Sequence, residues 1–189
     1  MELSVADKKE LLRIARESIA SALGDRSVER SHQSAASLKE HCGAFVTLHL
    51  HGELRGCIGY IEARFPLCET IEEAAVKAAF EDPRFLPLSA DEFENVEIEI
   101  SVLSPIQKIS SVDEIEVGKH GLVIDGGYTR GLLLPQVATE YGWGREQFLS
   151  QTCRKAGLPA DAWKKKGVTI YSFTSDVFSE AEIFRKAHR

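Results

Sequence analysis

A cysteine, an arginine and two glycines fall within the segment Leu54–Gly59. If this segment is a strand, Arg55 and Cys57 project from the same face, because successive side chains alternate. A nearby guanidinium favours the thiolate, which is the nucleophilic and metal-binding form of cysteine. Gly56 and Gly59 leave backbone that another group can approach closely. The pattern predicts a site at Cys57, in which Arg55 lowers the pKa of the thiol and holds an anion.

Both central residues also have ordinary structural explanations, and the sequence leaves these open. Most free cysteines pack as small apolar side chains, and Cys57 could be one of them. Arg55 could form a salt bridge across the sheet, and its candidate partners are Glu53, Glu97 and Glu99. Such a salt bridge is compatible with anion binding, since a guanidinium offers several donors.

His49 is the candidate general base for Cys57, and its placement depends on the register of a predicted hairpin. A two-residue loop at His51-Gly52 would suit the chemistry of tight turns. A three-residue loop that also includes Glu53 gathers the apolar residues of both strands on one face. Because register usually follows the buried face, we expect the three-residue loop, which turns His49 toward Cys57. His49, His51 and Cys57 are also metal-ligand types, but no further ligands follow at suitable spacing, so we predict no metal site.

Asp82 and Arg84 flank Pro83 directly after a predicted helix. They could close over the region of Cys57 and present charge to a ligand. The alternative is a helix stop with a local ion pair, which contributes little to stability if it is exposed.

Gln136 follows Pro135 at the start of another predicted helix. The free N–H groups at such a start can bind an anion, and the Gln136 amide could donate to the same ligand. Pro135 alternatively serves only to begin the helix, which is its commoner role.

Hydrophobic periodicity supplies the elements that would position these residues. Ser4 with Asp7, and Ser89 with Glu92, have the spacing of helix capping boxes. Helices and strands mix without regular β-α-β alternation, which predicts an α+β fold with a mostly antiparallel sheet and packed helices. The polar tail from Ala181 is expected to fray. The main predicted helices cover 4–23, 69–80 and 145–156, and the predicted strands cover 44–50, 54–60, 95–103, 121–125, 131–134 and 168–173.

Composition narrows the class of protein. The 189 residues carry a net charge of −6, which argues against a protein whose main role is nucleic-acid binding. The apolar runs are too short for a membrane span, and the N-terminus lacks the pattern of a secretory signal. The cysteines form no Cys-x-x-Cys pair, so we expect reduced thiols and a cytoplasmic protein. They are Cys42, Cys57, Cys68 and Cys153.

The segment Leu54–Gly59 resembles the signature of the AMMECR family, named for a human chromosomal region linked to Alport syndrome, midface hypoplasia and elliptocytosis. The resemblance implies two closely joined subdomains, the smaller over about 44–94 around the motif and the larger over 1–43 together with 95–189. It also implies partners, because prokaryotic members are often encoded beside Memo-like and radical S-adenosylmethionine proteins. It implies no particular reaction or cofactor. Other matching segments are Phe45–Leu48, Asp82–Phe85, Ser101–Pro105, His120–Leu122, Gly131–Val137, Cys153–Leu158 and Trp163.

Two functions are consistent with these observations. The first is an enzyme, or enzyme component, that uses a cleft centred on Cys57 to bind or modify a small molecule or protein side chain. It would act with Memo-like and radical S-adenosylmethionine partners. The second is a non-catalytic module that docks a partner protein on the strand Leu54–Gly59, where glycine-flanked backbone suits strand addition.

Overall fold

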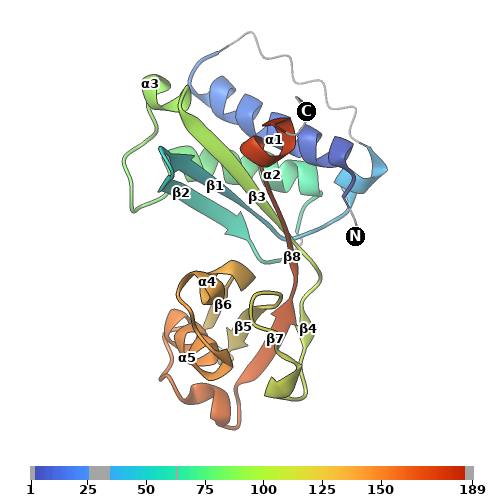
Figure 1. The fold of residues 1–189 in the computed structure, drawn as a ribbon, viewed down its shortest axis with the longest axis vertical. Helices are drawn as coiled ribbons and strands as arrows, with labels where there is room; N and C mark the ends of the chain where they lie inside the picture. The colour runs from blue at the N-terminus through green and yellow to red at the C-terminus, as the bar shows by residue number, and fades with distance from the viewer. Residues whose placement is uncertain (1–2, 26–34, 63, 186–189) are drawn as a thin grey trace. The chain divides into compact units, whose positions relative to one another are not determined.

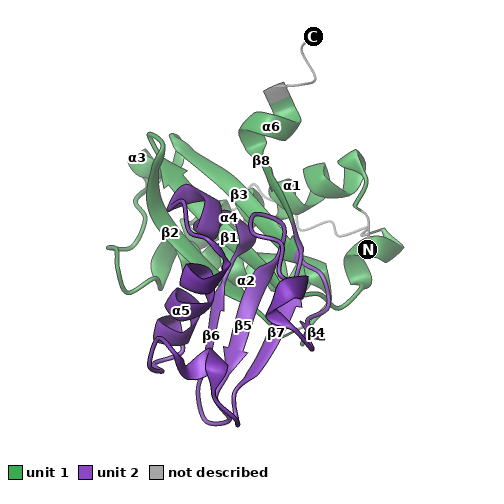
Figure 2. Ribbon diagram, turned by 60° about the horizontal axis from the view of Figure 1, so that its bottom comes forward, with its two compact units in different colours: residues 1–102, 176–189 green, residues 103–175 purple. Residues whose placement is uncertain are grey.

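The computed structural model describes residues 3–25, 35–62 and 64–185, and the chain divides into two compact units (Figures 1 and 2). Unit 1 comprises residues 1–102 and 176–189, and unit 2 comprises residues 103–175. Residues 26–34, between the first predicted helix and the first predicted strand, lie outside the described residues.

Unit 1 is a four-stranded sheet of order β2-β1-β3-β8, and one face of it packs against two helices. Strand β1 runs antiparallel to both β2 and β3, and α1 packs on α2. A short 3₁₀ turn, Ala36–Lys39, lies between α1 and β1. The elements are α1 (Val5–Ala22), β1 (Ala44–Leu50), β2 (Glu53–Tyr60), α2 (Leu67–Phe80), α3 (Ala90–Phe93), β3 (Val96–Leu103), β8 (Ser175–Ser179) and α6 (Glu180–Arg185).

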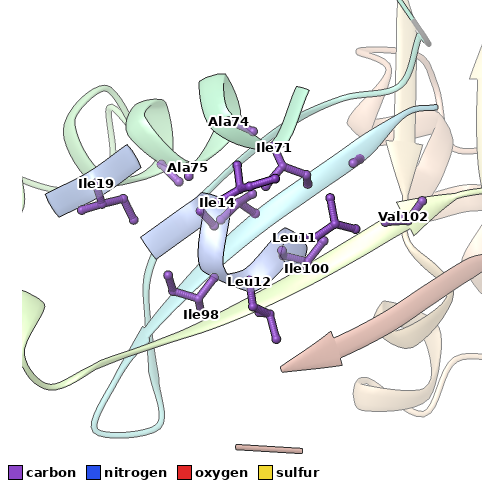
Figure 3. Close-up of a cluster of buried hydrophobic side chains, with 14 of the residues drawn as sticks. Leu11, Leu12, Ile14, Ile19, Ile71, Ala74, Ala75, Ile98, Ile100 and Val102 are labelled. Atoms are coloured by element: carbon purple, nitrogen blue, oxygen red, sulfur yellow. The ribbon is translucent and has the colours of Figure 1, made fainter. Parts of the chain in front are cut away.

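The core of unit 1 follows from two periodicities. Alternate residues of β3, from Val96 to Val102, point toward the helices, and the apolar stripe of α1 meets them there. Figure 3 shows Leu11, Ile71 and Ile100 among the side chains gathered between the helices and the sheet. Each is fully buried, which stabilises the fold by about 1.5–3 kcal/mol per side chain.

Unit 2 has its own four-stranded sheet, of order β4-β7-β5-β6, with antiparallel pairing throughout. Helix α5 packs on β5 and β6, and its buried residues Phe148, Leu149 and Cys153 join a separate hydrophobic core. The elements are β4 (Gln107–Lys108), β5 (Gly121–Asp125), β6 (Arg130–Leu133), α4 (Pro135–Glu140), α5 (Arg145–Lys155) and β7 (Thr169–Phe173), with 3₁₀ turns at Val112–Glu114 and Ala162–Lys164.

The α+β class and the antiparallel pairing confirm the prediction from sequence. Both predicted capping boxes form: the Ser4 hydroxyl accepts the Asp7 N–H at 3.2 Å, and the Ser89 hydroxyl accepts the Glu92 N–H at 3.3 Å. The described part of the tail, up to Arg185, differs from the expectation, because it belongs to a helix, α6, that packs on α1. Tertiary contacts stabilise this short polar helix, and local periodicity does not report them.

The boundary between the units differs from the expected subdomain boundary. The segment 44–94 is not separate from its flanking residues, since β1 pairs with β3 along its full length and α2 packs on α1. Residues 44–94 therefore share one core with α1, and the second unit begins at Leu103. Among the described residues, none of the helices has the length and hydropathy needed to cross a membrane.

Candidate functional site

The hairpin that carries Cys57 begins with a two-residue loop. His51 and Gly52 have φ values of 54° and 85°, and a tight turn of this kind needs positive φ at both positions. Next to the loop Leu50 pairs with Glu53, and His49 then pairs with Leu54. The expected three-residue loop is therefore wrong, because turn geometry determined the loop.

A β-bulge between Leu48 and His49 then shifts the register by one residue. Beyond the bulge, Leu48 pairs with Gly56 and Thr47 pairs with Cys57. This is the pairing that the three-residue loop would have produced, so the apolar residues of both strands still reach the buried face. The hairpin thus combines the preferred turn with the preferred burial.

Thr47 is the hydrogen-bonding neighbour of the Cys57 thiol. Its hydroxyl donates to the Cys57 sulfur at 3.3 Å. On the other side of β1, Thr47 pairs with Glu99 of β3. Since Val46 and Leu48 are buried in the core with the helices, the row from Cys57 through Thr47 to Glu99 lies on the opposite sheet face.

Asp82 fixes the outer edge of β2 at Cys57. Its carboxylate accepts the Cys57 N–H at 2.9 Å and three N–H bonds from Arg84, from the backbone at 3.1 Å, from Nε at 3.0 Å and from Nη2 at 2.7 Å. The Arg84 guanidinium, above all, holds the pKa of Asp82 well below its usual range, although burial opposes this. Asp82 is therefore an ionised, buried group that already occupies the backbone donor of Cys57.

Burial raises the pKa of the Cys57 thiol above its ordinary value. The Thr47 hydroxyl and the positive charge of Arg84 lower it by less, while the negative charges of Asp82 and Glu99 raise it further. The expectation that Arg55 lowers this pKa is wrong, because Arg84 is the cation that acts on the thiol. Cys57 is protonated at neutral pH.

Arg55 is held by an ion pair with Glu92. Its Nε and Nη2 donate to the two Glu92 oxygens at 2.9 and 3.1 Å, and Nη2 also donates to the Leu86 carbonyl at 2.9 Å. The Arg55 side chain is only 12% exposed, and its charge lies 5.8 Å from the centre of the Phe85 ring. Glu92 was not among the expected partners of Arg55. The arginine ties α3 and the loop before it to β2.

Glu92 itself has a strongly shifted pKa. The Arg55 guanidinium, followed by the N–H of Ser89, lowers the pKa of Glu92 to about 2. Glu92 thus combines two roles, in the capping box of α3 and in the ion pair with β2. The spacing of Glu92 from Ser89 predicted the capping box from the sequence, but no neighbouring residue in the sequence indicated the ion pair with Arg55.

The two glycines of the motif allow close packing. A Cβ at Gly56 would lie 2.2 Å from the Ala78 carbonyl oxygen of α2, and one at Gly59 would lie 2.3 Å from the Ala44 carbonyl oxygen of β1. These distances are too short for any side chain. Both glycines therefore have a packing role in unit 1, and their role in ligand binding stays a prediction.

Among the described residues, neither His49 nor Gln136 contributes a hydrogen bond to the contacts of Cys57, Asp82 and Arg84. His49 pairs with Glu97 on β3, and the hydrogen bond to the Cys57 sulfur comes from Thr47 in its place. Gln136 is the second residue of α4 and belongs to unit 2. In the described part of the chain, no group of three or more His, Cys, Asp or Glu residues is arranged to hold a metal ion.

The structure therefore brings together Cys57, Asp82 and Arg84 from the predicted set, and it adds Thr47 and Glu99. Thr47 was recognisable in principle, since it faces Cys57 in the expected register. Glu99 was considered only as a partner for Arg55. What the cluster offers chemically is a protonated thiol, a hydroxyl, two carboxylates and a half-exposed guanidinium.

Comparison with known proteins gives the family of the chain. A sequence model described as AMMECR1 matches residues 12–178. Protein MJ0810 of Methanocaldococcus jannaschii is 46% identical over 76% of this chain and 75% of its own length, and a protein of Aquifex aeolicus is 40% identical over 97% of both. The crystal structure of the uncharacterized protein PH0010 from Pyrococcus horikoshii superposes with a TM-score of 0.89 at 37% identity, over 97% of this chain and 96% of that one. The chain belongs to the AMMECR1 family.

Proposed function

We propose that this protein is a ligand-binding component of an enzyme system, and that the sheet face around Cys57 binds a small molecule or protein side chain. One observation carries the proposal: polar side chains from β1, β3 and the loop after α2 converge on Cys57 of β2. Memo-like and radical S-adenosylmethionine proteins, implied by the family resemblance, are the proposed partners.

The protonation of Cys57 favours binding over nucleophilic attack. A thiol whose pKa is raised by burial is a poor nucleophile at neutral pH, because only the thiolate attacks. A protonated thiol can still donate a weak hydrogen bond to a ligand while its sulfur accepts from Thr47. Any covalent step at Cys57 would require the thiol to lose its proton when the ligand binds.

Arg84 determines which ligands this face would favour. Its side chain is 53% exposed, yet Asp82 holds it in place with two side-chain hydrogen bonds. A guanidinium oriented in this way is suited to a carboxylate, phosphate or carbonyl oxygen. The proposed ligand therefore carries an anionic or hydrogen-bond-accepting group.

Partner titration tests the proposal. We expect the Memo-like or radical S-adenosylmethionine protein from the same organism to bind the full chain. Arg84→Gln should weaken that binding about tenfold, which corresponds to the loss of one charge-assisted hydrogen bond. Arg64→Gln is the matched control, since Arg64 is an exposed arginine of the same unit. Failure of both partners to bind, or equal binding by both variants, would contradict the proposal.

The reaction of Cys57 with iodoacetamide tests its protonation directly. We expect the rate, followed by mass spectrometry, to rise with an inflection above the ordinary thiol value of about 8.5. An inflection below that value would restore the nucleophilic interpretation. Cys57→Ser identifies the reacting residue and should leave the protein folded, since the hydroxyl can also accept the Thr47 hydrogen bond.

A non-catalytic docking module is the second candidate, and exposed leucines favour it. Leu86 is 83% exposed beside Arg55, and Leu54 is 41% exposed. Docking there would use side chains, because Asp82 already occupies the backbone donor that strand addition at Cys57 would need. Loss of partner binding in Leu86→Asp, with full binding in Arg84→Gln, would favour this candidate over the first.

A further inference from the structure

Strand β2 lies at one edge of the unit 1 sheet, because the strand order is β2-β1-β3-β8 (Figure 1). Within this described sheet, β2 pairs with β1 on one side only. The outward N–H and C=O groups of an edge strand can pair with a strand of another chain, and folded proteins block such edges by several means. The outer side of β2 therefore needs either a cover or a partner strand.

Cys57 has both of its outward backbone groups bound by side chains. Its N–H donates to the Asp82 carboxylate at 2.9 Å, and its carbonyl accepts a hydrogen bond from Arg84 Nη2 at 3.4 Å. In a neighbouring antiparallel strand, a backbone C=O and a backbone N–H would occupy these two places. The Asp82 carboxylate and the Arg84 guanidinium thus take the places that one residue of a further strand would fill.

Hydrogen bonds hold these two side chains together. Arg84 donates from Nε to one Asp82 oxygen at 3.0 Å and from Nη2 to the other at 2.7 Å, and its backbone N–H donates at 3.1 Å. The Asp82 side chain is only 2% exposed. A buried carboxylate is weak evidence for stability by itself, because removing a charge from water is costly. Its position at the outer edge of β2 indicates a second role, which is to block that edge.

The same loop reaches β2 at a second position. Arg55, two residues before Cys57, donates to the Leu86 carbonyl at 2.9 Å, and a β-bulge interrupts the ladder beside it. Covering loops and bulges are both devices that block sheet edges. Gly59, two residues after Cys57, presents its N–H and C=O to the same side, and no other group of the described chain caps them. Cys57 is therefore the position at which the cap stops the edge from being continuous.

We propose that Asp82 and Arg84 form an edge cap that keeps β2 from pairing with β2 of a second copy of this chain. An identical strand is the expected occupant, because two antiparallel copies present the same alternating donors and acceptors to each other in a twofold contact. Pairing would first have to displace the Asp82 carboxylate from the Cys57 N–H. The cap does not depend on the proposed function, because it uses the backbone of Cys57 and not the thiol.

Asp82→Ala opens the cap, and sedimentation velocity of the full chain measures the consequence. The substitution removes the acceptor for the Cys57 N–H and releases Arg84 from the edge. We expect the mass of Asp82→Ala to double as its concentration rises, over a range in which the unchanged protein keeps its mass. A closed twofold contact predicts a dimer and no larger species.

Hydrogen exchange of the Cys57 amide locates the contact in Asp82→Ala. In dilute protein this amide has lost its acceptor and exchanges fast, whereas pairing with a second copy would cover it again. For a dimer with a Kd of about 100 µM, raising the concentration from about 10 µM to about 1 mM should slow its exchange about fourfold. The amide of Ile124, in the core of unit 2, should show no such dependence.

Gly56→Ala is the matched control for loss of stability. Its added Cβ would meet the Ala78 carbonyl oxygen of α2, so it loosens unit 1 while the cap stays intact, and we expect it to keep the mass of the unchanged protein. Asp82→Ser is the second variant if Asp82→Ala does not fold, because its hydroxyl is one bond shorter and loses the 2.9 Å hydrogen bond to Cys57. Equal association of Gly56→Ala, no association of either Asp82 variant by about 1 mM, or association without protection of the Cys57 amide would overturn the proposal.

Discussion

Replacing Asp82 by alanine should destabilise unit 1 selectively. Asp82 is 4% exposed and accepts the N–H of Cys57, which lies on the outer edge of β2. An unsatisfied buried N–H costs about 1–3 kcal/mol, and loss of one partner of a buried charge pair can cost about 3–5 kcal/mol. The substitution removes the carboxylate partner of Arg84. Because the Arg84 side chain is 53% exposed, water can hydrate the guanidinium and offset part of this loss. We therefore expect a loss of about 3 kcal/mol.

Two measurements would detect this loss in the right unit. With a urea m-value of about 2 kcal/mol/M, the unfolding midpoint followed by far-UV circular dichroism should fall by roughly 1.5 M. Hydrogen exchange of the Cys57 amide should accelerate roughly a hundredfold, since 1.4 kcal/mol corresponds to about a factor of ten. Both tryptophans, Trp143 and Trp163, lie in unit 2, so their fluorescence reports on that unit alone.

Asp91→Ala is the control for this experiment. Asp91 is an exposed aspartate of the same unit, in the first turn of α3, and its replacement should cost less than about 0.5 kcal/mol. If Asp82→Ala stayed within about 0.5 kcal/mol of the unchanged protein, and the Cys57 amide kept its protection, the structural role assigned to Asp82 would be refuted.

The pH dependence of Asp82 follows from the direction of its pKa shift. Because the folded-state pKa lies below the unfolded value of about 3.9, the carboxylate contributes stability above that pH. This contribution is lost as the pH falls below about 4 toward the folded-state pKa. Asp82→Ala should therefore show a weaker loss of stability in acid than the unchanged protein.

Two further predictions concern the contacts around the motif. Gly56→Ala should destabilise unit 1 by about 2 kcal/mol or more in urea unfolding, because the added Cβ would meet the Ala78 carbonyl oxygen at 2.2 Å. Gly144→Ala, where no atom lies within 4 Å of the added Cβ, should change stability by less than about 1 kcal/mol, and equal effects of the two would contradict the packing role of Gly56. For Glu92, a carbon-13 NMR titration should give a pKa of about 2, and Arg55→Gln should return it toward 4.5. Since this pKa is depressed on folding, the stability that Glu92 contributes should be lost as the pH falls from about 4.5 to about 2, and an unshifted Glu92 would show that the ion pair does not form in solution.

Local rules in the sequence determined most of the elements of this protein. The capping pairs that begin with Ser4 and Ser89 placed two helix starts, and alternation along β3 identified its buried face. His51-Gly52 carried the chemistry of a two-residue turn, and the structure follows it. Such signals are readable because each depends on residues that are close in the chain.

Long-range pairing determined the site. The carboxylate that holds Arg55 is Glu92, although Glu53, Glu97 and Glu99 were equally plausible from sequence. The acceptor for the Cys57 N–H comes from Asp82, which lies 25 positions further along the chain. Several partners satisfy the same charge rule, and only the path of the backbone decides which of them is within reach.

The direction of the Cys57 pKa was also a tertiary outcome. The neighbouring arginine in the sequence suggested a thiolate, but Arg55 is engaged with Glu92, and burial of the sulfur dominates. The boundary of the units was decided in the same way, by the pairing of β1 with β3. The sequence by itself determined the local elements and identified Cys57 as the candidate site. Tertiary structure decided its partners and its protonation, because desolvation and charge depend on which distant residues fold around the thiol.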